Sequence, residues 1–114
     1  MALIYKICPA ADWDEARNQG AFTGSPVDRR DGFIHLSAGH QVQETARRHF
    51  AGQRGLVLIA FAPEDFGGTL KWEASRGGEL FPHVYGMLPV AQARWVKALP
   101  LGSDGHVFPE LVAE

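Results

Sequence analysis

Residues 2–8 form an apolar run in which Lys6 is the only charged residue, and this run predicts a strand that ends at Pro9. The period of two in a strand puts Leu3, Tyr5 and Ile7 on one face and Ile4 and Cys8 on the other. A helix is predicted to follow over residues 13–18, with Asp12 as its N-cap and Gly20 as its stop. Acidic side chains in the first turn of this helix suit the direction of the helix dipole. The first predicted unit is therefore a strand followed by a helix.

A second strand and a second helix are predicted in the middle of the chain, after a charged loop at residues 23–31 that we expect to be mobile. The strand covers residues 33–37, and the helical spacing of apolar side chains predicts the helix over residues 39–50. Residues 56–61 form a continuous apolar run bounded by turn residues. Such a run is typical of a central strand that is buried on both faces.

Strand candidates dominate the second half of the chain, at residues 70–73, 80–85 and 93–99. A turn at residues 76–78 would join the first two of them as a hairpin. The tail at residues 101–114 lacks periodicity, so we predict a loosely ordered C-terminal arm. Two strand–helix units followed by a strand-rich half indicate the α+β class, with the helices segregated rather than alternating throughout.

Composition supports a single α+β domain over residues 1–114, because 46% hydrophobic residues suffice for one core. The formal net charge is −2 with both signs interspersed, which excludes a polybasic surface for DNA and makes RNA an unexpected partner. Cys8 is the only cysteine, so an internal disulfide and a cysteine-based zinc cage are excluded and a reducing cytoplasm is expected. No signal-peptide pattern or bilayer-length apolar run occurs, so a cytoplasmic protein without a membrane partner is expected, and the oligomeric state is left open.

Polar side chains on two otherwise apolar strands are the main chemical signal. In the first strand, His35 and Ser37 share one face with Phe33. In the second, His83 and Tyr85 lie in an apolar stretch. Because convergent polar groups among aromatic side chains are typical of small-molecule sites, we predict that both imidazoles border one cavity beside the helix at residues 39–50.

Carboxylates and aromatic side chains accompany the second of these strands. Glu73 and Glu79 precede it, and we expect Glu73 or Tyr85 to donate or accept a hydrogen bond with one imidazole, because a buried imidazole without a partner is costly. Trp72 and Phe81 are candidate ligand contacts, with a place in the core as the alternative. No metal site is predicted, since the paired-ligand motifs of zinc enzymes are absent.

The whole chain resembles the small bacterial family known as the domain of unknown function 952 (DUF952). The pieces that carry the resemblance are Ile4–Ile7, Asp31–Ser37, Gln41–Ala46, Leu70–Glu73 and Leu80–Gly86. Their order also resembles, more distantly, the ADP-ribosyltransferase fold and the catalytic half of RNA 2′-phosphotransferases. This resemblance implies a mainly antiparallel split sheet with two helices in the N-terminal half, and NAD as a possible ligand although no cofactor is required.

The same resemblance implies roles for several side chains. Tyr5 or Lys6 matches the first-strand position that grips the ribose, and His35 matches the second. The late carboxylate is matched by Glu73 or Glu79, or is replaced by His83 or Tyr85. Ser37 with Arg29 or Arg30 would hold phosphate oxygens.

Three functional hypotheses follow from these residues and from the resemblance. In the first, the pocket binds a nucleotide or ribose phosphate without turnover. In the second, the protein is an active ADP-ribosyl or 2′-phosphate transferase, with His35, Glu73 and His83 as its catalytic residues. In the third, the histidines are satisfied core residues of a structural domain that has no small-molecule ligand.

Overall fold

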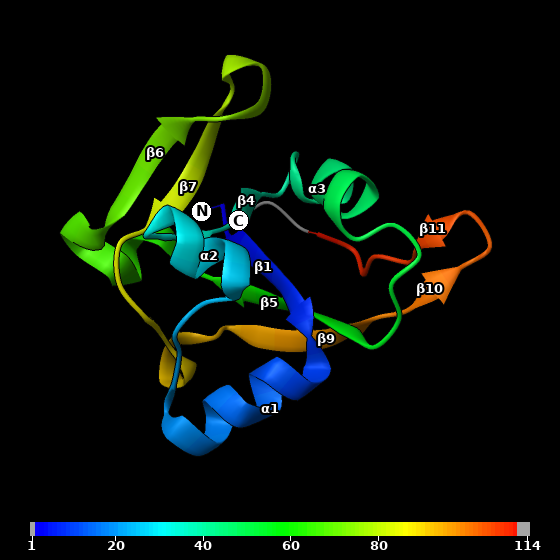
Figure 1. The fold of residues 1–114 in the computed structure, drawn as a ribbon, viewed down its shortest axis with the longest axis horizontal. Coiled ribbons are helices and arrows are strands. Elements are labelled where there is room, and N and C mark those ends of the chain that lie inside the picture. Colours follow the sequence, from blue (N-terminus) through cyan, green and yellow to red (C-terminus); the bar gives the residue numbers. More distant parts are fainter. Residues whose placement is uncertain (1, 112–114) are drawn as a thin grey trace.

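Antiparallel strands build the framework of the fold, and the computed structural model describes residues 2–111. The main sheet has the strand order β4-β1-β5-β9 and a second sheet has the order β3-β7-β6, with two short pairs, β2-β8 and β10-β11 (Figure 1). The strands are β1 (Ile4–Pro9), β2 (Ala21–Phe22), β3 (Ile34–His35), β4 (Ser37–Ala38), β5 (Leu56–Phe61), β6 (Leu70–Ala74), β7 (Leu80–Val84), β8 (Leu88–Pro89), β9 (Trp95–Leu99), β10 (Leu101–Gly102) and β11 (Gly105–His106). The predicted α+β class with mainly antiparallel strands is confirmed.

The described part of the chain has three α-helices where the sequence predicted two. They are α1 (Ala10–Gln19), α2 (Pro26–Asp31) and α3 (Val42–His49), and short 3-10 turns are η1 (Pro63–Thr69), η2 (Arg76–Gly78) and η3 (Val90–Gln92). The first helix starts directly after β1, so the predicted cap at Asp12 is wrong. The third is shorter at both ends than the predicted span of residues 39–50.

The additional helix, α2, occupies the segment for which a mobile loop was predicted, and local chemistry explains why it forms. The backbone N–H of Ser25 donates to the Asp28 carboxylate at 2.9 Å, and Pro26 stands in the first turn, where its fixed φ is already helical. Gly32 ends the helix with a φ of 86°, a left-handed conformation that glycine adopts without a steric penalty.

The strand predicted at residues 33–37 is divided between two sheets. Its first part, β3, pairs with β7, and its second part, β4, pairs with β1. Between them, the N–H of Leu36 donates to the carbonyl of Pro82 at 3.0 Å. His35 therefore belongs to one sheet and Ser37 to the other, with a single residue separating them.

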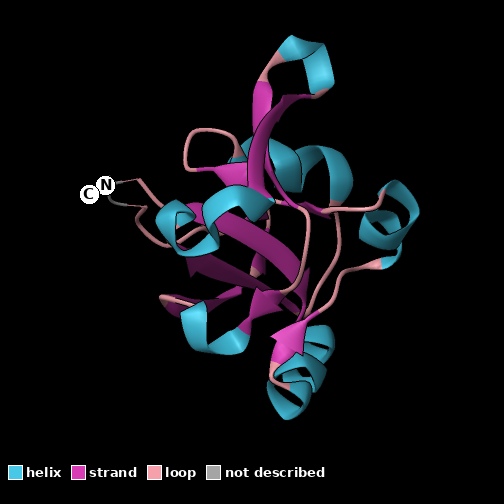
Figure 2. Ribbon diagram, turned by 90° about the vertical axis from the view of Figure 1, so that its left-hand side faces the viewer, coloured by secondary structure: helices cyan, strands magenta, loops and turns pink. Residues whose placement is uncertain are grey.

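The central strand β5 of the main sheet is buried on both faces, as its apolar run predicted. Ile59 and Phe61 pack with Trp13 of α1 on one side, while Leu58 packs with Val42 of α3 on the other. Helices flank the central strands, and the β6–β7 hairpin extends away from them (Figures 1 and 2). That hairpin confirms the predicted pairing of two strands across the turn at residues 76–78.

The segment after Pro100 is more ordered than the loose arm that was predicted. The strands β10 and β11 form a hairpin, and Phe108 and Leu111 pack against the core beside α3. The end of the predicted arm, residues 112–114, lies outside the described residues. Within residues 2–111 no helix is long and apolar enough to cross a membrane.

Candidate functional site

A cleft of about 600 Å³ lies beside β1 and is lined by residues of β1, α2 and α3. It exists because β4 covers only Ile4 and Tyr5 of the neighbouring strand, which leaves the edge of residues 6–9 facing the cleft. The apolar lining includes Ile7, Leu36 and Phe50. A cleft of this size, with an apolar floor, falls in the range of small-molecule sites.

His35 and His83 are directly opposite each other on β3 and β7, and both line this cleft. Their ring centroids lie 5.4 Å apart with the planes at 66°. Phe33 packs on both rings and stacks on His83 at 4.2 Å. The prediction that the two imidazoles border one cavity, with the long helix beside it, is confirmed.

Carboxylates hold both ring nitrogens of His35. Nδ1 lies 2.7 Å from Oδ1 of Asp28, and Nε2 lies 3.0 Å from Oδ2 of Asp31. Both aspartates belong to α2, where they are three residues apart, so this helix contacts the imidazole at two points. The arrangement fixes the His35 ring in place and leaves neither of its nitrogens free for a ligand.

Asp28 is the centre of a buried polar network. It accepts hydrogen bonds from Nζ of Lys6 and from the backbone N–H groups of Ser25 and His35. Burial alone would raise the pKa of Asp28, but the hydrogen bond with the His35 ring and the charge of Lys6 outweigh it and lower the pKa. Asp28 is therefore a buried carboxylate that stays ionised.

In the described part of the chain, only one ring nitrogen of His83 has a hydrogen-bond partner. Its Nδ1 lies 2.8 Å from Oε1 of Glu73, and the hydroxyl of Tyr85 donates to the same carboxylate at 2.9 Å. The hydrogen bond from His83, and to a smaller extent that from Tyr85, lowers the pKa of Glu73. The hydrogen bond to Glu73 in turn raises the pKa of Tyr85. The expected hydrogen bond between one imidazole and Glu73 or Tyr85 is confirmed.

Comparison with known proteins shows the family to which this chain belongs. The family model for "Protein of unknown function (DUF952)" matches residues 7–96. The chain belongs to the DUF952 family. Among curated proteins nothing matches it.

Solved structures of another protein have the same DUF952 fold. Protein CC0527 of Caulobacter crescentus is 56% identical, and its X-ray structure matches with a TM-score of 0.88 over 91% of each chain. Its solution NMR structure matches with a TM-score of 0.82 over 91% of this chain and 90% of that one, again at 56% identity. The predicted membership of DUF952 is confirmed by the family model, and the solved structures show the same fold in a protein that is 56% identical.

The structure divides the predicted site residues of this DUF952 protein into two groups. Those that line the cleft are Tyr5, Lys6, Arg30, His35, Ser37, Phe81 and His83. Those outside the cleft lining are Arg29, Trp72, Glu73, Glu79 and Tyr85. Their functional roles stay predictions.

Residues outside the lining have specific neighbours. Glu73 is bonded to the ring of His83, and Tyr85 donates to Glu73. Glu79 instead contacts the exposed ring of His40. Arg29 donates to the Thr23 hydroxyl at the surface. Trp72 is largely exposed on the β6–β7 hairpin and belongs neither to the core nor to the cleft.

Asp28 and Asp31 are the residues of the candidate site that sequence reasoning missed. Both were assigned to a loop, although Ser25, Pro26 and Asp28 occupy the cap, first and third positions expected of a helix start. Gly32 supplies the matching stop signal. Recognition of this pattern would have placed both carboxylates on one short helix next to His35.

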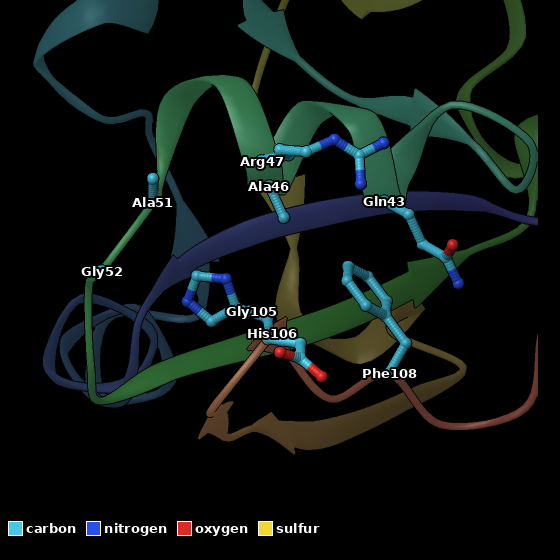
Figure 3. Close-up of a pocket in the computed structure, with 9 residues that line it drawn as sticks. Gln43, Ala46, Arg47, Ala51, Gly52, Gly105, His106 and Phe108 are labelled. Atoms are coloured by element: carbon cyan, nitrogen blue, oxygen red, sulfur yellow. The ribbon is translucent and has the colours of Figure 1, made fainter.

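A second hollow, of about 430 Å³, lies between α3 and the β10–β11 hairpin (Figure 3). Gln43 and Arg47 project from the helix, and His106 and Phe108 from the C-terminal segment. The ring of His106 is bonded to the carbonyl of Gln53, and the guanidinium of Arg47 is bonded to Glu44. His106 and Arg47 are thus committed to neighbours within the protein, and the cleft beside β1, with its two opposed imidazoles, is the better candidate site.

Proposed function

We propose that the cleft beside β1 binds a small nucleotide or ribose phosphate, without turnover. The observation that carries this proposal is the convergence of His35 and His83 on one wall of a cleft with an apolar floor. Two imidazoles brought together from different strands, each held by carboxylate contacts, form a polar wall in a cleft whose floor is apolar. That combination is how sites for small polar molecules are commonly built.

Different parts of the cleft suit different parts of such a ligand. Leu36, Phe50 and Phe81 offer apolar surface for a base. The hydroxyl of Ser37, held at 2.8 Å from that of Thr45, and the ring of His83 offer hydrogen bonds for a sugar. The Arg30 guanidinium, which is paired with Asp31 but is 73% exposed at the rim, offers charge for a phosphate, whereas Lys6 is buried in its pair with Asp28.

The hydrogen bonds of Glu73 and the position of Glu79 favour binding without turnover over ADP-ribosyl transfer. A transferase needs a carboxylate that can stabilise positive charge at the anomeric carbon of the ligand. Oε1 of Glu73 accepts from both His83 and Tyr85, and Glu79 lies on the hairpin next to His40, outside the cleft. The distant resemblance to ADP-ribosyltransferases therefore supports the class of ligand more than the reaction.

Thermal unfolding in the presence of NAD, ADP-ribose and ribose 5-phosphate tests the proposal. A ligand at one hundred times its dissociation constant adds about 2.7 kcal/mol to the free energy of unfolding. We expect at least one of these ligands to stabilise the protein, and the His83→Asn variant to lose that gain. The matched control is His40→Asn, since His40 is exposed and lies outside the cleft lining.

Two other outcomes would change the conclusion. Release of nicotinamide from NAD, lost in Glu73→Gln, would establish turnover and support the transferase hypothesis. If no nucleotide or sugar phosphate stabilised the protein and His83→Asn only lowered its stability, the histidines would be structural and the binding function would be wrong.

A further inference from the structure

The two imidazoles of the cleft differ in how many of their nitrogens are occupied. Both nitrogens of His35 contact carboxylates, at 2.7 Å and 3.0 Å. Only Nδ1 of His83 has a partner, Glu73, among the described residues. Among the described residues, the polar side-chain atoms that are fully buried and have no hydrogen-bond partner are Nε1 of Trp13 and Oε1 of Gln92. Nε2 of His83 is not one of them, so this nitrogen reaches accessible space. His83 lines the cleft and Glu73, the partner of Nδ1, does not, which favours the cleft as the space that Nε2 faces.

Glu73 fixes which nitrogen of His83 carries the proton in the neutral ring. A carboxylate only accepts hydrogen bonds, so Nδ1 must be the protonated nitrogen when it lies 2.8 Å from Oε1. Nε2 of the neutral ring is then left with a lone pair. The Tyr85 hydroxyl donates to both oxygens of Glu73, at 2.9 Å and 3.1 Å, and so keeps this carboxylate in position.

We propose that Nε2 of His83 is the acceptor atom of the cleft, and that it binds a hydroxyl group of the ligand, as a ribose diol would supply. A hydroxyl can donate to the lone pair, whereas a fully ionised phosphate has only acceptors and cannot. His35, with both nitrogens occupied, acts as a clamp between β3 and α2. This inference rests on the proposed function and specifies which part of the ligand lies at His83.

Other charged groups near His83 come from each element packed around it. Lys71 is its neighbour across the β6–β7 pair, and Lys71 also lies over the ring of Tyr85. On the other side are His35 of β3 and, along the same cleft, Arg30 and Asp31 of α2. Arg30 and Asp31 are bonded to each other. The direct hydrogen-bond partner of the His83 ring is Glu73.

Modification by diethyl pyrocarbonate tests whether Nε2 of His83 is available. In this reaction the lone pair attacks a carbonyl carbon, an N–C bond forms, and ethyl carbonate leaves with the electron pair of the broken C–O bond. The Nδ1 proton is released to solvent, so the modified ring is neutral. The reaction requires a nitrogen lone pair, and at about pH 8 an ordinary imidazole, with a pKa near 6.5, is mostly neutral.

For the relative rates at which His35 and His83 are modified, solvent exposure and hydrogen bonding lead to opposite expectations. The His35 side chain is 32% exposed and that of His83 only 5%. Exposure alone would make His35 react faster. We expect the reverse, with His83 modified at least several-fold faster in the peptides identified by mass spectrometry. Faster modification of His35, or an unreactive His83, would overturn the assignment.

Nitrogen NMR of the histidine rings tests the position of the proton directly. In the wild-type protein and in the control Glu79→Leu, the neutral ring of His83 should carry its proton on Nδ1. In Glu73→Leu the proton should move to Nε2, the form that a free imidazole prefers. A wild-type ring protonated on Nε2 would contradict the proposal, and this measurement and the modification experiment both work on the wild-type protein without any ligand.

A ligand comparison separates failure of this inference from failure of the proposed function. We expect ribose 5-phosphate to raise the melting temperature more than inorganic phosphate at the same concentration. Equal stabilisation by both would keep the binding site but refute the hydroxyl assignment at His83. No stabilisation by either, nor by NAD or ADP-ribose, would refute the binding function itself.

Discussion

Nζ of Lys6 and the carboxylate of Asp28 lie 2.9 Å apart, with side chains that are only 7% and 1% exposed. Their ion pair joins β1 to α2, and the same ammonium group donates to the carbonyl of His35 at 3.0 Å. Because both charges are removed from water, each depends on the other for its stability. The helix that borders the cleft is therefore attached to the main sheet through this pair.

Removal of one partner should destabilise the protein strongly. We expect Asp28→Ala to lower the free energy of unfolding by about 3–5 kcal/mol, because the charge of Lys6 is left buried without its partner. Urea unfolding measures this loss, and the double variant Lys6→Met with Asp28→Leu should lose less than the sum of the single variants. The control is Asp14→Ala, whose exposed pair with Arg17 should contribute about 0–1 kcal/mol. Equal losses in Asp28→Ala and the control would contradict the importance of the buried pair.

The same carboxylate should make stability depend on pH in the acid range. Hydrogen bonds and the charge of Lys6 lower the pKa of Asp28 below its ordinary value of 3.8, despite the opposing effect of burial. The folded state thus prefers the ionised form, and its contribution is complete above the ordinary pKa and declines as the pH falls below it. The difference in unfolding free energy between wild type and Asp28→Asn should shrink as the pH falls below about 4. A difference that stayed constant down to about pH 2 would show that Asp28 does not titrate in this way.

Cys8 should be unreactive in the native protein. Burial raises the pKa of its thiol to about 12, from an ordinary value of 9.0, so the nucleophilic thiolate is not formed near neutral pH. The contribution of the neutral thiol to stability is complete below 9.0 and is lost as the pH rises toward about 12. Reaction with a chromogenic disulfide at about pH 8 should be slow in buffer and complete in urea. Rapid labelling without denaturant would show that the thiol is open to the cleft.

Tyr85 should influence the acidity of Glu73. In Tyr85→Phe the pKa of Glu73 should rise, because one of the donors that stabilise the carboxylate is lost, but only part of the way to its ordinary value of 4.5, since the His83 hydrogen bond remains. Carbon NMR of the Glu73 carboxyl during a pH titration measures the change. Tyr5→Phe is the control, because Tyr5 is the other tyrosine of the chain and packs against Trp95 instead. An unchanged titration in Tyr85→Phe would mean that the hydroxyl does not contact Glu73 in solution.

Sequence reasoning succeeded where the signal was local and periodic. The alternation along β1 placed Ile4 and Tyr5 on opposite faces, and the unbroken apolar run of β5 indicated burial on both faces. The proximity of His35 and His83 was also predicted, because both lie in strands with polar residues on one face. In β1 and β5 the period of the strand itself carries the information, whereas the proximity of His35 and His83 was inferred from the polar side chains that both strands carry among apolar ones.

The rest depended on contacts between distant segments or on elements too short to show a period. Six residues are enough for α2 but not for a recognisable amphipathic pattern, so Asp28 and Asp31 were not expected beside His35. The same limit hid the order of the C-terminal segment, where Phe108 is ordered by the core it packs against. Which nitrogens of His35 and His83 are free could be decided only from the three-dimensional positions of the carboxylates.

The order of the main sheet also has a consequence for how the protein folds as it is synthesised. β1 pairs along its whole length with β5, Ile4 opposite Phe61, and β5 pairs in turn with β9 near residue 99. A ribosome that adds about 5–20 residues per second completes β5 roughly 3–10 s after β1, and β9 later still. We therefore expect the apolar side chains of β1 to remain unpaired during early translation, and folding of the complete chain to be slow for its size because its central contacts are so distant in sequence.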